Sequence, residues 1–184
     1  MSKKVLLPMA DGFEEIETVT IIDVLRRAGL EVVTAGTKAG VLLGSRCVKL
    51  IPDTVLESVK EEEFEMVVLP GGQPGVDNLR KHAGVLQILQ KMSQRKKWVA
   101  AICAAPLILR DAGLIKNATL TSHPSVQECL PGVRYLQDRV VVEGRLITSR
   151  GPGTAMEFAL KIVELLCDAN KVRELSEAML TKVA

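Results

Sequence analysis

The sequence predicts an α/β fold in which a mostly parallel sheet carries helices on both faces. Short β-rich apolar runs alternate with helical patterns along the whole chain. The strand runs are continuously apolar, which is typical of parallel strands buried on both faces. The chain has 184 residues and a mass of 20.0 kDa, the size of one ordinary domain. We therefore expect one domain over residues 1–184.

The first half of the chain alternates strands with one clear helical pattern. Gly29 ends the predicted helix, and Pro70 with two glycines ends the last strand. The expected elements are a strand at 4–9 (KVLLPM), a helix at 14–28, a strand at 31–35 (EVVTA), a glycine-containing hairpin at 41–51 and a strand at 65–69 (EMVVL).

The second half continues this alternation. Glu143 and Gly144 separate two β-rich runs as a hairpin turn does, and Thr154 and Glu157 have capping-box spacing. The expected elements are a helix at 85–94, a strand at 98–102 (WVAAI), a helix at about 104–112, a short strand at 119–121, a hairpin at 139–142 and 146–148, and helices at 154–166 and 171–180.

Charge and hydropathy exclude several classes of function. Lys and Arg number 24 and Asp and Glu number 22, so the net charge of +2 gives no support to nucleic-acid or membrane binding through bulk charge. The longest uncharged run, 98–109, contains a proline and is shorter than the roughly 20 residues of a membrane span. The apolar stretch 5–10 is too short for a signal peptide, so we expect a cytoplasmic protein.

The cysteines and the missing motifs argue against cofactors. Cys47, Cys103, Cys129 and Cys167 are widely spaced with no C-x-x-C, so we expect four thiols without zinc or disulfides. The sequence has no Walker motif, no G-x-G-x-x-G and no H-E-x-x-H. We therefore expect no nucleotide, metal or other cofactor.

Chemically useful residues follow several predicted strands. Asp11 follows the first strand, Gly71 and Gly72 follow the strand at 65–69, Cys103 follows the strand at 98–102, and His123 follows the strand at 119–121. The carboxyl ends of parallel strands share one edge of the sheet, where ligands bind in open α/β folds. These residues therefore converge on one candidate site.

Cys103 has the setting of a nucleophile on a sharp strand-to-helix turn. Its neighbours Ala101 and Ala105 are small, as close approach of strand and helix requires. A helix N-terminus lowers the pKa of a thiol, and N–H groups at Gly71 and Gly72 could form an oxyanion hole beside it. A buried structural cysteine and a plain glycine loop remain the alternatives.

The acids and histidines are less specific. Glu14, Glu15 and Glu17 lie in a first helical turn, where the helix dipole stabilises acids, but one of them could face inward with a raised pKa and move a proton. His123 could orient a substrate or relay a proton, although a lone histidine is often structural. His82 lies in a polar stretch and is expected to be solvated.

Five motifs together resemble one known family. They resemble the DJ-1/PfpI superfamily in register over nearly the whole chain, and they are most similar to its DJ-1 branch, the parkinsonism-associated deglycase proteins. The motifs are 14–19 (EEIETV), 23–29 (DVLRRAG), 68–72 (VLPGG), 100–106 (AAICAAP) and 148–154 (TSRGPGT).

This resemblance implies a flavodoxin-like three-layer sandwich, a homodimer and a specific site. It implies that the cysteine oxidises readily to a sulfinate held by a protonated glutamate. The implied residues are the reactive Cys103, the acid Glu17 that touches it, His123 at the pocket, the backbone amides of Gly71, Gly72 and Ala104 facing the reacting oxygen, and Arg46 near the dimer interface and pocket.

The chain also departs from relatives within the superfamily. Gly44 and Ile51 stand where vertebrate members carry extra cysteines, so redox behaviour assigned to those cysteines does not transfer. The protease branch has a histidine immediately after the cysteine, where this chain has Ala104, which argues against peptidase activity. The His-x-Glu pair of related glutamine amidotransferases is absent, because Pro124 and Ser125 follow His123.

Three functions remain open at the level of sequence. The first is cysteine-dependent removal of small reactive aldehydes or dicarbonyls, either by converting methylglyoxal to lactate or by protein deglycation. The second is a redox sensor or redox-regulated chaperone that uses the same oxidisable thiol without significant catalysis. The third is a structural domain with inert thiols, which the motif match disfavours. The expected partners are a dicarbonyl substrate and a second copy of the chain.

Overall fold

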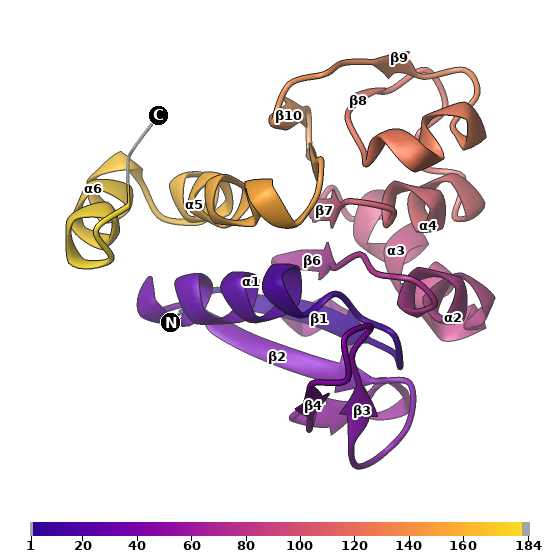
Figure 1. The fold of residues 1–184 in the computed structure, drawn as a ribbon, viewed down its shortest axis with the longest axis horizontal. Coiled ribbons are helices and arrows are strands. Elements are labelled where there is room, and N and C mark those ends of the chain that lie inside the picture. The colour runs from indigo at the N-terminus through magenta and orange to yellow at the C-terminus, as the bar shows by residue number, and fades with distance from the viewer. Residues whose placement is uncertain (1, 182–184) are drawn as a thin grey trace.

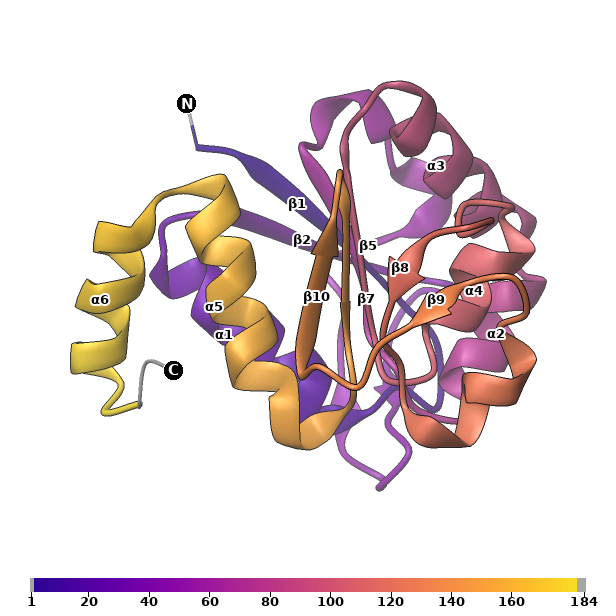
Figure 2. The same cartoon turned by 90° about the horizontal axis from the view of Figure 1, so that it is seen from above.

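The computed structural model describes residues 2–181 and places a seven-stranded sheet between two layers of helices (Figure 1, Figure 2). The strands are β1 (Lys4–Met9), β2 (Glu31–Gly36), β3 (Leu42–Leu43), β4 (Lys49–Leu50), β5 (Thr54–Val55), β6 (Met66–Leu69), β7 (Trp98–Ile102), β8 (Thr119–Leu120), β9 (Arg134–Tyr135), β10 (Val140–Glu143) and β11 (Leu146–Ser149). The helices are α1 (Glu15–Arg27), α2 (Gly75–Lys81), α3 (Ala83–Gln94), α4 (Pro106–Asp111), α5 (Ala155–Leu166) and α6 (Ala169–Ala178). Short 3-10 helices cover 56–58, 61–63, 124–129 and 152–154.

The main sheet has the strand order β10-β11-β7-β6-β1-β2-β5. All of its pairs are parallel except β10 with β11. The chain runs outward from β1 to β2 and then returns to the other side of β1 with β6. In open α/β sheets, ligands bind at such a reversal of strand order, beyond the carboxyl ends of the strands. The topology therefore points to the loops after β1 and β6.

A proline helps to open the sheet at this reversal. The β1–β2 ladder continues to Met9, whereas the β1–β6 pairing ends at Leu6. Lys4 accepts a hydrogen bond from the segment before β6, and Met9 accepts one from the segment after β2. Alternation along the strand therefore directs Pro8 toward β6, and proline has no N–H to donate. Pro8 therefore donates no backbone hydrogen bond to β6, and the two strands separate at this point.

Two apolar cores fill the space between the sheet and the helices. α1 and α5 cover one face with α6 outside them, whereas α2, α3 and α4 cover the other face (Figure 2). Odd-numbered residues of β1, such as Leu7, belong to the first core, and Leu6 belongs to the second. The predicted three-layer sandwich with a mostly parallel sheet and helices on both faces is confirmed.

The expected elements occur with local differences. Both predicted hairpins form, as β3–β4 and β10–β11. The strand expected at 119–121 forms as β8 (Thr119–Leu120) and pairs with the unpredicted β9 in a separate two-stranded sheet. α6 begins earlier than predicted, because the Asp168 side chain caps it by accepting from the Lys171 N–H. The short helix α2 and the two-residue strand β5 were also not predicted. Within residues 2–181, no helix is long and apolar enough to cross a membrane.

We predict that Phe158→Ala destabilises the protein by about 3–5 kcal/mol, because the Phe158 side chain is fully buried between α5 and the sheet and its loss leaves a cavity. Urea unfolding followed by circular dichroism measures this loss. Val142→Ala, at a side chain that is 42% exposed, is the control and is expected to change stability by less than about 1 kcal/mol. Equal losses in the two variants would contradict the assignment of this core.

Candidate active site

Cys103 occupies a constrained turn directly after β7. Its φ of 65° lies in the left-handed region, which a side-chain-bearing residue rarely adopts. The turn is held from two sides, because the Cys103 N–H donates to the Ser149 oxygen (3.0 Å) and the Cys103 oxygen accepts from the His123 N–H (2.8 Å). The thiol is half-buried. The strand-to-helix turn expected at Cys103 is present, although α4 begins only at Pro106.

The three acids of the first turn of α1 have three different contacts. Glu14 caps the helix by accepting from the Glu17 N–H (2.7 Å). Glu15 accepts from the N–H of Arg46 and from the Ser45 hydroxyl, so it fixes the turn between β3 and β4. Glu17 alone is fully buried and faces the loop after β6. The structure thus identifies Glu17 as the acid that faces inward.

Gly71 separates Glu17 from Cys103. Its N–H donates to Glu17 Oε2 at 2.8 Å. A Cβ atom added to Gly71 would lie 2.6 Å from Cys103 Cβ, 2.7 Å from Glu17 Oε2 and 3.1 Å from Cys103 Sγ. The carboxyl and the thiol therefore flank the same small space, and only glycine leaves that space open.

The surroundings of Glu17 favour its protonated form. Burial raises the pKa of Glu17 to about 7, and the charge of Glu14 adds to the rise. The Gly71 N–H and the neighbouring Cys103 thiol oppose it. Glu17 Oε1 is buried and, among the residues that the structure describes, has no hydrogen-bond partner. This carboxyl is therefore poised to gain or lose a proton near neutral pH.

The thiol is coupled to this carboxyl. Burial first, and then the Glu17 carboxylate, raise the pKa of Cys103 to about 12. The backbone N–H groups of Ala104 and Gly72 face the sulfur and lower its pKa. The lower thiol pKa expected at a helix N-terminus is thus outweighed by burial and by the carboxylate. Because two neighbouring negative charges repel each other, Glu17 and Cys103 titrate as one pair.

His123 lies next to this group, on the segment after β8. Its Nδ1 accepts from the Ser125 N–H (3.2 Å) and lies 2.7 Å from the Ser125 hydroxyl, so the neutral ring carries its proton on Nε2. A Cβ atom added to Gly151 would lie 3.5 Å from the His123 ring. His123 is therefore oriented by Ser125 and packed against the loop between β11 and α5.

Within one chain, Arg46 contacts the turn between β3 and β4 and makes no hydrogen bond or ion pair with Cys103 or Glu17 among the described residues. Its side chain is exposed, and its guanidinium donates to the oxygen of Ser45 at 3.0 Å. Its backbone is tied to Glu15 in the turn between β3 and β4. The contacts of Arg46 within the chain thus connect it with Glu15 and Ser45.

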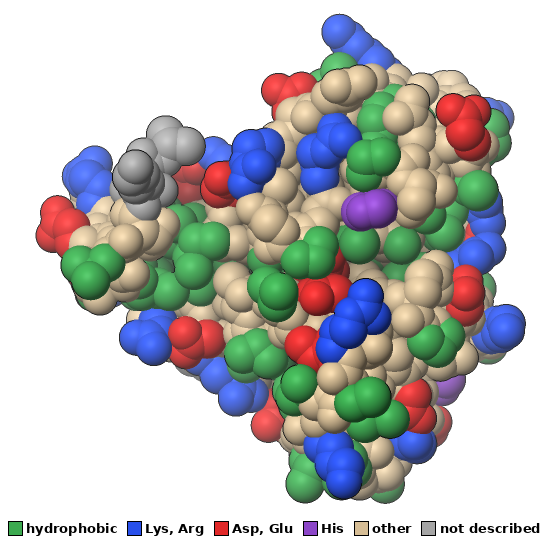
Figure 3. Space-filling view, viewed as in Figure 1, with side chains coloured by type: hydrophobic (Ala, Val, Ile, Leu, Met, Phe, Trp, Pro, Cys, Tyr) green, Lys and Arg blue, Asp and Glu red, His purple; other side chains and the backbone are tan. Residues whose placement is uncertain are grey.

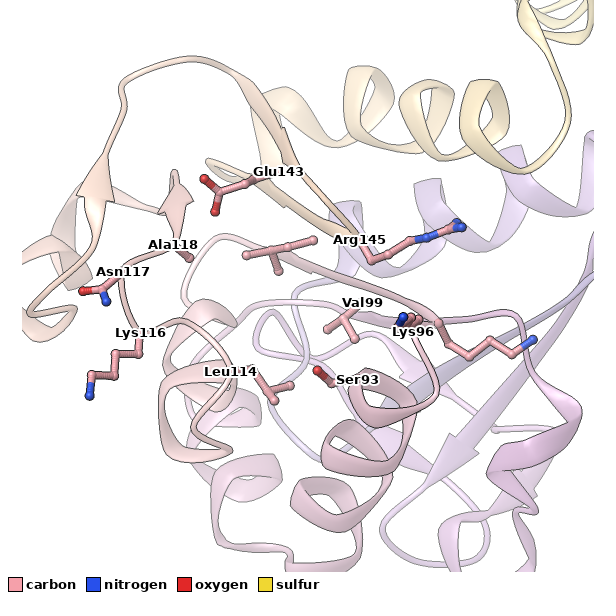
Figure 4. Close-up of a pocket in the computed structure, with 11 residues that line it drawn as sticks. Ser93, Lys96, Val99, Leu114, Lys116, Asn117, Ala118, Glu143 and Arg145 are labelled. Carbon is pink, nitrogen blue, oxygen red and sulfur yellow. The ribbon is translucent and has the colours of Figure 1, made fainter.

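A cavity of about 510 Å³ lies at the opposite end of the sheet from Cys103 (Figure 4). It is lined by residues that precede β7 and β11 and by the segment before β8. Figure 4 shows Val99 and Leu114 within it, whereas Lys116 and Arg145 point away from its centre. This cavity contains no member of the group around Cys103. Across residues 2–181, no cluster of three or more His, Cys, Asp or Glu side chains is arranged to hold a metal ion.

Residues that follow β11 support the site through contacts that the sequence did not indicate. The expected capping box of Thr154 with Glu157 is wrong, because the Thr154 side chain makes no capping hydrogen bond to α5 among the described residues and turns back to the preceding loop. Thr154 Oγ1 accepts from the N–H groups of Arg150 (3.2 Å) and Gly151 (3.1 Å) and contacts the Ser149 hydroxyl (2.7 Å). Ser149 in turn holds the backbone of Cys103. These residues belong to the motif TSRGPGT, whose identity was visible in the sequence although its contacts were not.

Comparisons with known proteins agree with this fold. A model of the DJ-1/PfpI family matches residues 3–165. The protein dj-1beta of Drosophila melanogaster is 43% identical over 183 residues, which cover 98% of each chain. The crystal structure of Drosophila DJ-1beta superimposes with a TM-score of 0.96 and 42% identity, and the match covers 100% of both chains. The glutathione-independent glyoxalase DJR-1.2 of Caenorhabditis elegans is 38% identical over 176 residues, which cover 95% of this chain and 93% of that protein.

These matches establish the family of the chain and its branch within that family. The chain is a flavodoxin-like α/β protein of the DJ-1/PfpI family. Its similarity to Drosophila dj-1beta and to the Danio rerio Parkinson disease protein 7 homolog, which is 39% identical over 185 residues, places it in the DJ-1 branch.

We predict that Glu17→Gln, made in a Cys103→Ser background to isolate the carboxyl, gains stability relative to its parent as pH rises. A carboxyl with a raised pKa stabilises the folded state below its unfolded pKa of 4.5 and loses that contribution as pH rises through about 7. The difference between the variants should therefore grow by about 3 kcal/mol between pH 4.5 and 7.5.

Urea unfolding across this pH range measures that difference. Asp23→Asn in the same background is the control, because Asp23 is exposed and forms a surface ion pair with Arg27. A difference between Glu17→Gln and its parent that does not change with pH would contradict a buried carboxyl with a raised pKa.

Proposed function

We propose that this protein converts small dicarbonyls to hydroxy acids, with Cys103 as nucleophile and Glu17 as general acid and base. The observation that carries this proposal is the apposition of a half-buried thiol and a fully buried carboxyl whose pKa is raised to about 7. Methylglyoxal is the simplest substrate of this class, and lactate is its product. The relative DJR-1.2, named as a glutathione-independent glyoxalase, supports this reaction.

The first step is addition of the thiol to the aldehyde carbon of methylglyoxal. Glu17 accepts the proton of Cys103 as the sulfur attacks, and the proton then passes to the aldehyde oxygen. The product is a hemithioacetal. Because the proton moves within the pair, the raised pKa of the resting thiol is compatible with its reactivity.

The second step moves hydrogen between the two carbonyl carbons. Glu17 removes the proton from the carbon bound to sulfur, which gives an enediol, and returns it to the neighbouring carbon. The result is a thioester of lactate on Cys103. Water then hydrolyses the thioester to lactate and the free thiol. The aldehyde carbon is oxidised to the carboxyl level while the ketone carbon is reduced to an alcohol, so no external oxidant or reductant is needed.

Backbone amides support the charged states of this sequence. The N–H groups of Gly72 and Ala104 face the sulfur and are positioned to stabilise an oxyanion that forms on the carbon attached to it. The Gly71 N–H is committed to Glu17, so we assign Gly71 to holding the acid in place. His123, with its proton on Nε2, is assigned to hydrogen-bonding the second carbonyl oxygen of the substrate.

We predict that purified, reduced protein forms lactate from methylglyoxal and that Cys103→Ser and Glu17→Gln lower kcat/KM at least about 100-fold, because each removes a group that reacts with the substrate. Lactate is measured enzymatically. Cys129→Ser is the matched control, because Cys129 is an exposed thiol outside this group, and it should retain wild-type turnover.

Turnover by Cys103→Ser at the wild-type rate would refute the proposal. Absence of turnover by wild-type protein whose Cys103 is confirmed reduced by intact mass would also refute it. In that case the redox-sensor or chaperone function becomes the better account, and peroxide-dependent client binding that requires Cys103 would test it. The same assay with a glycated peptide in place of methylglyoxal tests deglycation.

We also propose a homodimer formed through α1 and the β3–β4 hairpin. Ile16 and Val19 on α1 and Leu43, Val48 and Ile51 in the hairpin region are large apolar side chains left exposed, with Ile51 at 69% and Ile16 at 58%. Figure 3 shows hydrophobic side chains over this part of the surface. Exposed apolar patches of this kind mark protein interfaces. Arg46 lies in the turn between β3 and β4, so the proposed dimer would place it near the interface, as the family resemblance implies.

We predict that wild-type protein sediments as a dimer and that Val19→Asp combined with Ile51→Asp sediments as a monomer, because two buried charges without partners oppose association. Sedimentation velocity measures the mass. Leu180→Asp, at a residue that is 93% exposed beyond α6, is the control and should remain dimeric. A wild-type protein that sediments at 20.0 kDa would exclude the dimer.

A further inference from the structure

The backbone of Arg150 lies between two residues that adjoin the candidate active site. The residue before it, Ser149, accepts a hydrogen bond from the Cys103 N–H (3.0 Å). The residue after it, Gly151, contacts the His123 ring, where an added Cβ atom would lie 3.5 Å from Cδ2. The backbone of Arg150 thus bridges the turn that holds the thiol and the loop that packs on the imidazole.

The guanidinium of Arg150 has an unsatisfied donor among the residues that the structure describes. The side chain is half-buried, and its Nη1 is buried with no hydrogen-bond partner among the described residues. Several other arginines contact a carboxylate, namely Arg26, Arg27, Arg80, Arg110 and Arg139. Removing a charged donor from water without a partner is unfavourable. An anion bound beside Arg150 would supply the acceptor that the described residues do not provide.

The loop around Arg150 is rigidly held. The Thr154 hydroxyl accepts from the N–H groups of Arg150 and Gly151. Arg139 donates to the Gly153 oxygen (2.6 Å) and to Glu157 (2.5 Å), which ties the same loop to α5. Within residues 2–181, this fixed loop thus carries a cation with one unsatisfied donor, and a group held in advance in this way suits a binding site.

We propose that Arg150 is the specificity-determining residue that binds the anionic group of small organic acids at Cys103. The ligands are carboxylates of two to three carbons, which include the acid product of the proposed reaction and carbonyl substrates that carry a carboxylate. A guanidinium forms charge-assisted, bidentate hydrogen bonds with a carboxylate. The substrate class rests on the proposed function, whereas anion binding is testable without turnover.

Alkylation of Cys103 by two reagents of similar size tests the charge selectivity. Iodoacetate carries a carboxylate and iodoacetamide is neutral, and both form the same bond to sulfur with loss of iodide. The ratio of their rates cancels any change in the thiolate fraction of Cys103. Rates are read at Cys103 by peptide mass spectrometry, which separates it from the other thiols.

We expect Arg150→Gln to lower the iodoacetate-to-iodoacetamide ratio about tenfold, the loss of one charge-assisted contact. Arg173→Gln, which removes the same charge from α6, is the matched control and should keep the wild-type ratio. An unchanged ratio in folded Arg150→Gln would overturn the proposal.

A second measurement uses wild-type protein only, so it does not depend on the folding of a variant. Lactate is expected to slow the alkylation of Cys103 by iodoacetamide and to leave Cys167 unaffected, whereas neutral lactamide protects neither thiol. Equal protection by lactate and lactamide, or none by lactate, would overturn the proposal. Charge selectivity without methylglyoxal turnover would refute the proposed reaction alone, and turnover without charge selectivity would refute the role of Arg150 alone.

Discussion

The site depends on the contact between one buried carboxyl and one constrained thiol. Glu17 comes from the first turn of α1 and Cys103 from the turn after β7, and they meet across Gly71, whose missing side chain leaves the space between them. Burial disfavours charge on both groups, and each negative charge disfavours the other. Near neutral pH the pair therefore retains a proton that can move between them. The surrounding turns serve to fix this pair, with Ser149 and the His123 N–H on the thiol side and Gly71 on the acid side.

The fold explains why these loops meet. The strand order reverses between β1 and β6, and the ladder between these strands stops before Pro8. The opening leaves room for the first turn of α1 and for the glycine loop after β6. Two apolar cores then hold the helices on either face, so the position of Glu17 is set by the packing of α1 through side chains such as Ile21 and Leu25. The chemistry is local, but its geometry depends on the whole sheet.

Much of this was predictable from the sequence, because strand periodicity and the glycine stops are local signals. The sheet class, both hairpins and the convergence of Cys103 with Gly71 and Gly72 follow from them. The choice among Glu14, Glu15 and Glu17 was not available from the residues alone, since all three suit a first helical turn and only tertiary contacts separate them. The resemblance to the family made that choice. The short elements β5, β9 and α2 were not predicted, because a hydrophobic period cannot be recognised over so few residues.

The sequence also could not show that Arg150 Nη1 has no hydrogen-bond partner within residues 2–181, because this depends on tertiary contacts and the motif alone resembles an ordinary loop. In the proposed function, and with the role that we propose for Arg150, this edge of the sheet combines a nucleophile, an acid, amide donors and a cation. The coupling of Glu17 with Cys103 underlies this whole account. The pH profile of Cys103 alkylation by iodoacetamide, compared between wild type and Glu17→Gln, tests it most directly. The account predicts that the profile of Glu17→Gln moves to lower pH than that of wild type, because the Glu17 carboxylate raises the pKa of the Cys103 thiol. Superimposable profiles would contradict it.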